Sequence, residues 1–277
     1  LNDLVELALN NNEFTGSVPT EIGFLANLMI LNWNSNLLQR VPTELGRLER
    51  LSILNLDSNS LRGPLPSEFG MLTQLGNLRL GNNSLTGTIP VQLSGLVKLR
   101  QLVLGANNFS GSNSLGLFEN LTSINYLSLR KNGFSGTLPS DFGMFHTIRY
   151  FDLALNNCSG NLPTELKTLT NLEFLDFSNN DFAGSVPPHL GNLTDLNSLN
   201  LGGNELSGTI PSTIGHLSGL TTLNLGFNNL SGQTPSSLNQ LTELTVLVLS
   251  GNQNLSGSIS GNDICSNLEH ELDAFLS

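Results

Sequence analysis

The sequence predicts an α/β solenoid, in which the chain winds into a row of short and similar coils. A nine-residue frame of the form L-x-x-L-x-L-x-x-N returns at intervals of 23 to 25 residues, giving eleven repeats of about 24 residues between positions 4 and 266. Apolar residues alternate within the frame, which indicates a short strand with one buried face. Self-similarity at this period is typical of stacked repeats, so we expect a single domain over residues 1–277.

The ninth position of the frame is the most regular feature of the sequence. It is Asn in all eleven repeats, at positions 12, 36, 59, 83, 107, 132, 156, 180, 204, 228 and 252. A side-chain amide both donates and accepts hydrogen bonds, so a buried Asn can bind backbone groups where the chain leaves a strand. We therefore predict that these residues form a ladder between consecutive coils and do not bind a ligand.

The second half of the repeat contains turn-forming residues. Nine of the eleven repeats have Pro at the same position, most often after an apolar residue and a Gly, as in Gly87-Thr88-Ile89-Pro90. Gly permits a left-handed turn, whereas Pro fixes φ and prevents a central ladder hydrogen bond. A helical turn then ends in Leu-Gly-x-Leu, as at 190–193. The fifth repeat lacks the Ile-Pro segment, and we expect a local bulge there, at 112–118, on the outer face.

The combined pattern L-x-x-L-x-L-x-x-N-x-L-x-G-x-I-P-x-x-L-G-x-L covers nearly the whole chain and resembles the plant-type leucine-rich repeat. That family includes the ectodomains of receptor-like kinases and receptor-like proteins, polygalacturonase-inhibiting proteins and surface proteins of algae. The resemblance implies a right-handed superhelix with a concave parallel β-sheet, helical or 3-10 turns, and short second β-segments on the outer side. It also implies binding of a partner outside the cell, by a secreted protein or a membrane-protein ectodomain.

Composition and charge exclude several functions. The chain has 22 acidic and 11 basic residues, a net charge of −11, so nucleic acids and anionic membranes are poor partners. No apolar run in the sequence is long enough to span a membrane. Charged residues make up only 12% of the chain, and the remaining polarity comes from uncharged side chains, as is common outside cells. Because the repeat pattern is already present at Leu1, we expect a trimmed piece, with an incomplete C-terminal cap beginning at 267–277.

The two cysteines do not form a disulfide framework. Cys158 occupies the apolar position after the ladder Asn, where other repeats have Phe134 and Phe182, and we expect it to be a small buried residue. Cys265 is at least four coils away, or ~20 Å at one strand spacing per coil, which is too far for a disulfide bond. Two interpretations stay open for Cys265: an unpaired structural residue, or a partner in a cap beyond Ser277, as the resemblance implies.

The sequence contains no recognisable catalytic arrangement. With three Lys and no G-x-x-x-x-G-K-[ST] motif, a phosphate-binding loop is excluded. The four His are scattered and no pair has the spacing of metal ligands. We therefore predict no enzymatic activity, no cofactor and no metal, and the sequence leaves the oligomeric state undecided.

The strand positions that face away from the core are the better candidates for function. An aromatic residue occupies the same position in three consecutive repeats, which predicts an exposed aromatic column with polar residues beside it. The candidate ligand-binding residues are Tyr126, Ser128, Arg130, Tyr150, Asp152, Phe174 and Asp176, with Lys131 at one end. Aromatic faces flanked by carboxylates suit a sugar ring or a peptide side chain. The alternative is that the aromatic residues only stabilise the sheet by cross-strand stacking.

Seven N-x-[ST] sequons are possible N-glycosylation sites: Asn82, Asn108, Asn120, Asn157, Asn192, Asn229 and Asn254. Taken together, these features favour an extracellular or cell-surface recognition scaffold that binds a protein, peptide or glycan. A second hypothesis is a structural or adhesive protein of a cell wall or matrix. A third is binding to ice or mineral surfaces through outer Thr and Ser rows, although Arg62 and Gln233 interrupt those rows.

Overall fold

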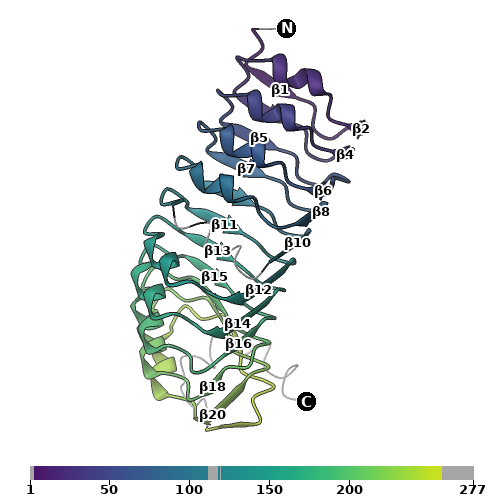
Figure 1. The fold of residues 1–277 in the computed structure, drawn as a ribbon. Helices are drawn as coiled ribbons and strands as arrows, with labels where there is room; N and C mark the ends of the chain where they lie inside the picture. Colours follow the sequence, from purple (N-terminus) through teal and green to yellow (C-terminus); the bar gives the residue numbers. More distant parts are fainter. Residues whose placement is uncertain (1–2, 112–117, 119, 258–277) are drawn as a thin grey trace. The chain divides into compact units, whose positions relative to one another are not determined.

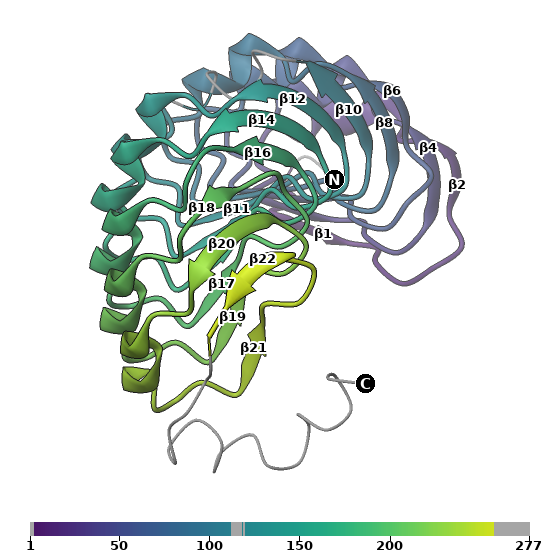
Figure 2. The same cartoon turned by 90° about the horizontal axis from the view of Figure 1, so that it is seen from below.

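The computed structural model describes residues 3–111, 118 and 120–257. The chain forms two compact units, Leu1–Gly136 and Thr137–Ser277. In each coil the chain passes from a strand of a first parallel sheet to a strand of a second sheet, and then in nearly every coil through a 3-10 turn to the next coil (Figures 1 and 2). The predicted α/β solenoid is therefore confirmed.

The first sheet consists of three-residue strands from the beginning of each repeat. In the first unit these are β1 (Glu6–Ala8), β3 (Ile30–Asn32), β5 (Ile53–Asn55), β7 (Asn77–Arg79), β9 (Gln101–Val103) and β11 (Tyr126–Ser128). In the second unit they are β13 (Tyr150–Asp152), β15 (Phe174–Asp176), β17 (Ser198–Asn200), β19 (Thr222–Asn224) and β21 (Val246–Val248). Paired strands are parallel and in register, so equivalent residues of successive repeats lie side by side.

The alternation of apolar residues places one side chain of each strand in the core. Leu54 of β5 and Leu78 of β7 are register partners, and both are fully buried. Burying a Leu side chain contributes about 1.5–3 kcal/mol. The equivalent Leu or Phe is fully buried in every first-sheet strand except β1 and β21. A one-residue shift in register would move the whole row to the solvent side, so the Leu rows fix the register of the first sheet.

The second sheet is a row of short parallel strands from the segment that follows the ladder Asn, and the row is interrupted within each unit. Its strands in the first unit are β2 (Thr15–Ser17), β4 (Leu37–Arg40), β6 (Arg62–Pro64), β8 (Ser84–Gly87), β10 (Asn108–Gly111) and β12 (Gly133–Thr137). Those of the second unit are β14 (Asn157–Asn161), β16 (Asp181–Ala183), β18 (Ser207–Gly208), β20 (Asn229–Gln233) and β22 (Asn254–Ser256). These strands confirm the predicted second β-segments, and glycines such as Gly87 adopt the positive φ expected for the turn.

A Pro precedes each of the described five-residue 3-10 turns. The turns are η1 (Thr20–Phe24), η2 (Thr43–Arg47), η3 (Ser67–Met71), η4 (Val91–Gly95), η6 (Ser140–Met144), η7 (Thr164–Thr168), η8 (Pro188–Asn192), η9 (Ser212–His216) and η10 (Ser236–Gln240). Pro19 has φ −63°, and its carbonyl accepts the N–H of Ile22 at 3.2 Å. Because Pro already has a helical φ and no N–H to leave unpaired, it is suited to begin such a turn.

The ladder Asn residues join each coil to the previous one, as predicted. Asn180 is buried, and its Nδ2 donates to the carbonyl oxygens of Leu153 at 3.0 Å and Phe177 at 3.2 Å. Its Oδ1 accepts the backbone N–H of Cys158 at 2.9 Å. One side chain thus binds backbone groups of two coils, at the corner where the chain leaves the first sheet.

Cys158 is a buried residue, as its position in the repeat predicted. Its side chain is fully buried, and burial raises the pKa of the thiol to about 12, with the Asp181 carboxylate adding to the shift. The bulge predicted at 112–118 lies, except for Phe118, outside the described residues. Cys265 and the cap expected at 267–277 also lie outside them.

We predict that Asn180→Ala lowers the free energy of unfolding by about 2–4 kcal/mol, because backbone groups of Cys158 and Leu153 then lose their partners in the core. Urea denaturation of the full chain measures this change. Asn157→Ala is the matched control, since Asn157 is exposed, and it should change stability by less than about 0.5 kcal/mol. Equal effects of the two substitutions would contradict a structural role for the ladder.

We also predict that the Cys158 thiol does not react with iodoacetamide at neutral pH in the folded chain, because a buried thiol with a raised pKa forms almost no thiolate. Mass spectrometry of the folded and the urea-unfolded chain measures the extent of alkylation. Rapid modification of Cys158 in the folded chain would show that its coil opens readily.

Candidate functional site

Two of the predicted aromatic residues form a stacked pair in the second unit. Tyr150 of β13 and Phe174 of β15 are register partners, with ring centroids 4.3 Å apart and ring planes inclined by 6°. Both residues are half-buried and lie on the side of the sheet away from the Leu core. Tyr126 occupies the equivalent position in the first unit and is also half-buried. Its membership of one column with Tyr150 stays a prediction.

The polar residues expected beside the column are less exposed than predicted. Asp152 and Asp176 are only 4% and 6% exposed, and Ser128 is also buried, so the prediction of solvent-facing polar side chains is wrong for these three residues. The reason is local hydrogen bonding along the strand. Oδ1 of Asp152 accepts the N–H of Ala154 at 3.0 Å, and each carboxylate folds back towards its own backbone instead of extending into solvent.

These carboxylates have partners that the sequence did not suggest. Oδ1 of Asp176 accepts both the N–H of Ser178 at 2.9 Å and its hydroxyl at 2.6 Å. The hydroxyl of Tyr150 donates to Oδ2 of Asp152 at 3.5 Å. Asp152 thus lies beside the Tyr150 hydroxyl, and the half-buried rings of Tyr150 and Phe174 are more exposed than either carboxylate.

The remaining candidate residues lie in the first unit. Arg130 and Lys131 are exposed, and Lys131 adopts a φ of 54° at the corner after β11. Together with Tyr126 and Ser128 they belong to Leu1–Gly136, whereas Tyr150, Asp152, Phe174 and Asp176 belong to Thr137–Ser277. The structure thus brings the second group together, and a joint site with the first group stays a prediction.

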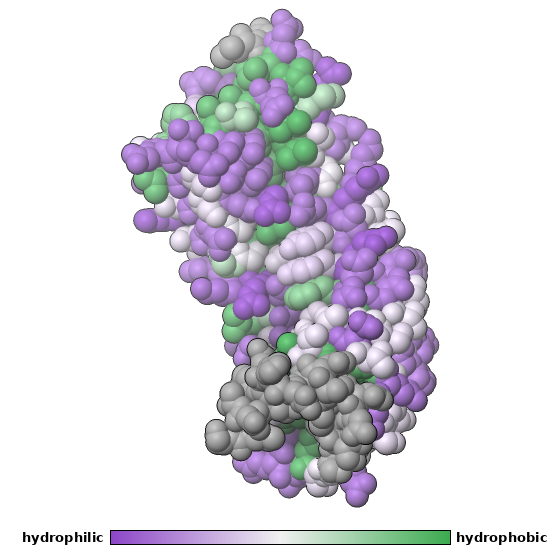
Figure 3. Space-filling view, turned by 180° about the vertical axis from the view of Figure 1, so that it is seen from behind, coloured by the Kyte–Doolittle hydropathy of each residue, from purple (hydrophilic) through white to green (hydrophobic). Residues whose placement is uncertain are grey.

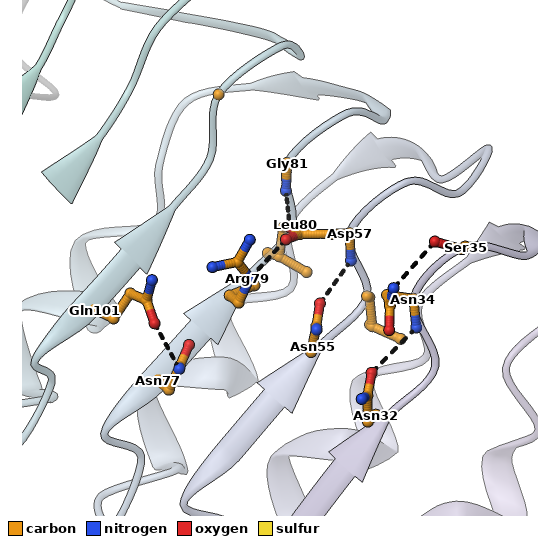
Figure 4. Close-up of polar contacts among 12 residues, drawn as sticks. Asn32, Asn34, Ser35, Asn55, Asp57, Asn77, Arg79, Leu80, Gly81 and Gln101 are labelled. Carbon is orange, nitrogen blue, oxygen red and sulfur yellow. Dashed lines mark hydrogen bonds and ion pairs between the residues drawn. The ribbon is translucent and has the colours of Figure 1, made fainter. Parts of the chain in front are cut away.

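A polar cluster on the first sheet of the first unit was not singled out from the sequence. Nε of Arg79 donates to Oδ2 of Asp57 at 2.6 Å, and Oδ1 of Asp57 accepts the N–H of Gly81 at 2.6 Å (Figure 4). Beside it, Nδ2 of Asn77 donates to Oε1 of Gln101 at 2.6 Å. Asp57 and Arg79 are 22 residues apart and occupy different positions of adjacent repeats, so a comparison of equivalent positions does not pair them.

Burial is the largest influence on the pKa of the Asp57 carboxyl group. Desolvation raises the pKa of its carboxyl group above the usual value, and the charge and hydrogen bond of Arg79 offset this effect in part. The guanidinium of Arg79 is partly exposed, so the pair lies at the boundary between the sheet and solvent.

The seven sequons lie away from the outward positions of the first sheet. All seven Asn residues are exposed. Four of them, at 108, 157, 229 and 254, begin the second-sheet strands β10, β14, β20 and β22. Asn192 ends η8, and Asn82 has a φ of 51° at a coil corner. Glycosylation of each of these residues stays a prediction.

The outer serine row has a structural partner in the second unit. The hydroxyls of Ser207, Ser231 and Ser256 donate to glycine carbonyl oxygens of the preceding coils at 3.3, 3.4 and 3.2 Å. Hydroxyls that are engaged between coils are less available to order water or to match a crystal lattice.

Apolar side chains also gather near the N-terminal end of the first unit, where Figure 3 shows a green area. Val5, Phe14 and Leu37 are among the exposed residues there.

No described helix combines the length and the apolar composition needed to span a bilayer. Within the same part of the chain, no group of three or more His, Cys, Asp or Glu residues is arranged to hold a metal ion.

We predict that Arg79→Met makes stability more dependent on pH, because the pKa of Asp57 then rises further. An Asp with a raised pKa in the folded state stabilises the fold at low pH, and this contribution is lost as the pH rises through that pKa. Between about pH 4 and pH 7, the free energy of unfolding should therefore fall more for the variant than for the wild type. Urea titrations measure it, with the exposed Arg62→Met as control; parallel curves for all three proteins would contradict the prediction.

Comparison with known proteins agrees with the repeat structure. A leucine-rich-repeat model matches residues 189–253, and a second matches 50–72, 74–96, 123–145 and 171–193. Together these matches cover more than half of the chain. No curated protein matches the sequence.

Several solved structures are similar over most of the chain. A TDR receptor is 32% identical with a TM-score of 0.89, over 92% of this chain and 44% of that one. The Arabidopsis receptor kinase HAESA, in complex with the peptide hormone IDA and the co-receptor SERK1, is 30% identical with a TM-score of 0.73, over 92% and 51%. A plant ice-binding protein is 29% identical with a TM-score of 0.73, over 93% and 84%.

The chain thus spans about half the length of the two receptor chains. The recurring frame, the paired parallel sheets, the Asn ladder and the repeat matches agree with one another. On this evidence the chain belongs to the leucine-rich-repeat proteins.

Proposed function

We propose that the chain is an extracellular, non-catalytic recognition scaffold that binds a peptide or protein partner on its first sheet. The observation that carries the proposal is the stacked pair of Tyr150 and Phe174. Aromatic residues are frequent energetic centres of interfaces, and a pair already held in place loses little side-chain entropy on binding. The Asp152 carboxylate lies 3.5 Å from the Tyr150 hydroxyl, at the edge of this pair.

The choice of a peptide or protein partner is supported by the receptors of similar fold. HAESA was solved with a peptide hormone and a co-receptor, and another similar structure is a plant peptide hormone receptor in complex with RGF2. An extracellular location is supported by these receptors and by the exposure of all seven sequons. The Gly-x-Ile-Pro segments and the turns that follow them support assignment to the plant-type subclass, which is part of the proposal.

Ice binding is the second candidate. The match to the plant ice-binding protein extends over 84% of that protein's length, which is a larger share than for the two receptors. The second unit offers Thr137, Ser185 and Thr209 at equivalent outer positions, but Asn161 and Gln233 interrupt the row. The neighbouring hydroxyls of Ser207 and Ser231 donate hydrogen bonds to glycine carbonyl oxygens of the preceding coils. Recognition through the first sheet is therefore the better-supported function, whereas a glycan ligand or a structural role in a wall or matrix has no comparable support.

We predict that Tyr150→Ala and Phe174→Ala each weaken binding of peptides selected from a random display library against the wild-type chain. Each change should raise Kd by about tenfold or more, since it removes half of a stacked interface pair. Surface plasmon resonance with the selected peptides measures the effect.

Phe24→Ala is the matched control, because Phe24 is 67% exposed but belongs to η1. It removes an aromatic surface away from the first sheet and should leave Kd unchanged. Unchanged binding by both Tyr150→Ala and Phe174→Ala would limit the pair to a packing role. Inhibition of ice recrystallisation by the wild-type chain, with no peptide selected, would favour the second candidate.

A further inference from the structure

We propose that Arg79, on the first sheet of the first unit, binds a side-chain carboxylate of a bound peptide, and that Asp57 is the positioning residue for its guanidinium. The inference rests on the proposed recognition function, but it concerns a different unit from the aromatic pair. The carboxylate site is formed by Asp57, Arg79 and Gly81.

The guanidinium of Arg79 is engaged at one nitrogen. Nε donates to Asp57, whereas within the described part of the chain neither Nη nitrogen has a hydrogen-bond partner. In Figure 4 the dashed line to Asp57 starts at Nε of Arg79, and no dashed line starts at either Nη nitrogen. Two donors at the end of a planar guanidinium match the two oxygens of a carboxylate, so the free end of Arg79 suits bidentate binding.

Asp57 is itself fixed by its neighbours. Its Oδ1 accepts the N–H of Gly81 at 2.6 Å, and its own backbone N–H donates to Oδ1 of Asn55 at 3.1 Å. Its side chain is 12% exposed. A buried carboxylate with fixed hydrogen bonds holds the Arg79 side chain in one geometry, which reduces the entropy that the side chain loses on binding a ligand.

Gly81 leaves the position beside Asp57 without a side chain. A Cβ on Gly81 would lie 3.3 Å from Oδ1 of Asp57 and 3.2 Å from Cγ1 of Val103. The glycine therefore lets Asp57 accept the Gly81 N–H at 2.6 Å, and a larger residue would crowd the carboxylate that holds Arg79.

Charge further restricts the ligand. Arg79 is the only basic residue in the six described first-sheet strands of the first unit, in a chain with a net charge of −11. An anionic group on this face is therefore attracted to Arg79, where the Asp57 carboxylate offsets part of the positive charge. The nearby Asp57 carboxylate opposes a multiply charged phosphate more strongly than a singly charged carboxylate, so an acidic side chain is the better fit.

The test compares peptides that differ only in charge. Peptides selected on the wild-type chain are synthesised with C-terminal amides, each in an acidic form and in a form with Glu→Gln and Asp→Asn changes. The wild type should bind the acidic forms about tenfold more tightly, because hydrogen bonds between charged groups are the stronger ones. Arg79→Gln and Arg79→Lys should both lose most of this preference, since Lys retains the charge but not the paired donors.

Arg62→Gln is the matched control, because it removes the same charge from an exposed residue of β6 on the second sheet. An equal loss of preference in Arg62→Gln and Arg79→Gln would overturn the proposal in favour of net charge. A preference that survives Arg79→Gln, in a variant with a wild-type circular dichroism spectrum, would overturn it as well.

A second measurement separates this proposal from the recognition function. N-acetylglutamate N-methylamide is titrated into the labelled wild-type chain, with the glutamine analogue as control, and NMR signals of Arg79 Nε–H and the Gly81 amide are followed. Saturable shifts with the glutamate probe alone would support the carboxylate site even if no peptide is selected. No shift at either signal at millimolar probe would overturn it.

Discussion

The side-chain amide of the ladder Asn is the interaction on which the other contacts between coils depend. In the coil of Asn204, Nδ2 donates to the carbonyls of Phe177 and Leu201, and Oδ1 accepts the N–H of Phe182. These backbone groups lie at the corner between the first and second sheets, where no strand partner reaches them. Because the backbone N–H and C=O groups at the corner have hydrogen-bond partners, the chain can turn directly from the first sheet to the second, and the buried Leu rows stay in register.

Much of the fold could be predicted because the same structural residues recur at the same positions in nearly every repeat. The Leu positions, the ladder Asn and the Pro before each described turn are local constraints, so one repeat predicts its neighbours. Cys158 was correctly placed in the core for the same reason, since its position is that of Phe182 in the next repeat. Positions that vary between repeats carry no such information, and the candidate site is built from them.

The exposure of Asp152 and Asp176 shows where sequence reasoning failed. Strand alternation gives the side of the sheet from which a side chain starts, but not the direction in which it then turns. Oδ1 of Asn224 accepts the N–H of Gly226 at 3.0 Å, which repeats the hydrogen bond that Asp152 makes to Ala154. A short Asp or Asn at this position therefore accepts a hydrogen bond from the backbone of its own coil. The ion pair of Asp57 with Arg79 was missed for another reason, since it joins residues at different positions of adjacent repeats.

The ladder has a consequence for the biosynthesis of the chain. Asn107, Asn156 and Asn228 are buried ladder residues, and each is followed directly by an exposed sequon Asn. An oligosaccharyltransferase acting on the nascent chain would modify the second residue of each pair, while the first keeps its amide for the fold. Sugar addition at these sequons would therefore leave the ladder amides unmodified and able to form their hydrogen bonds between coils.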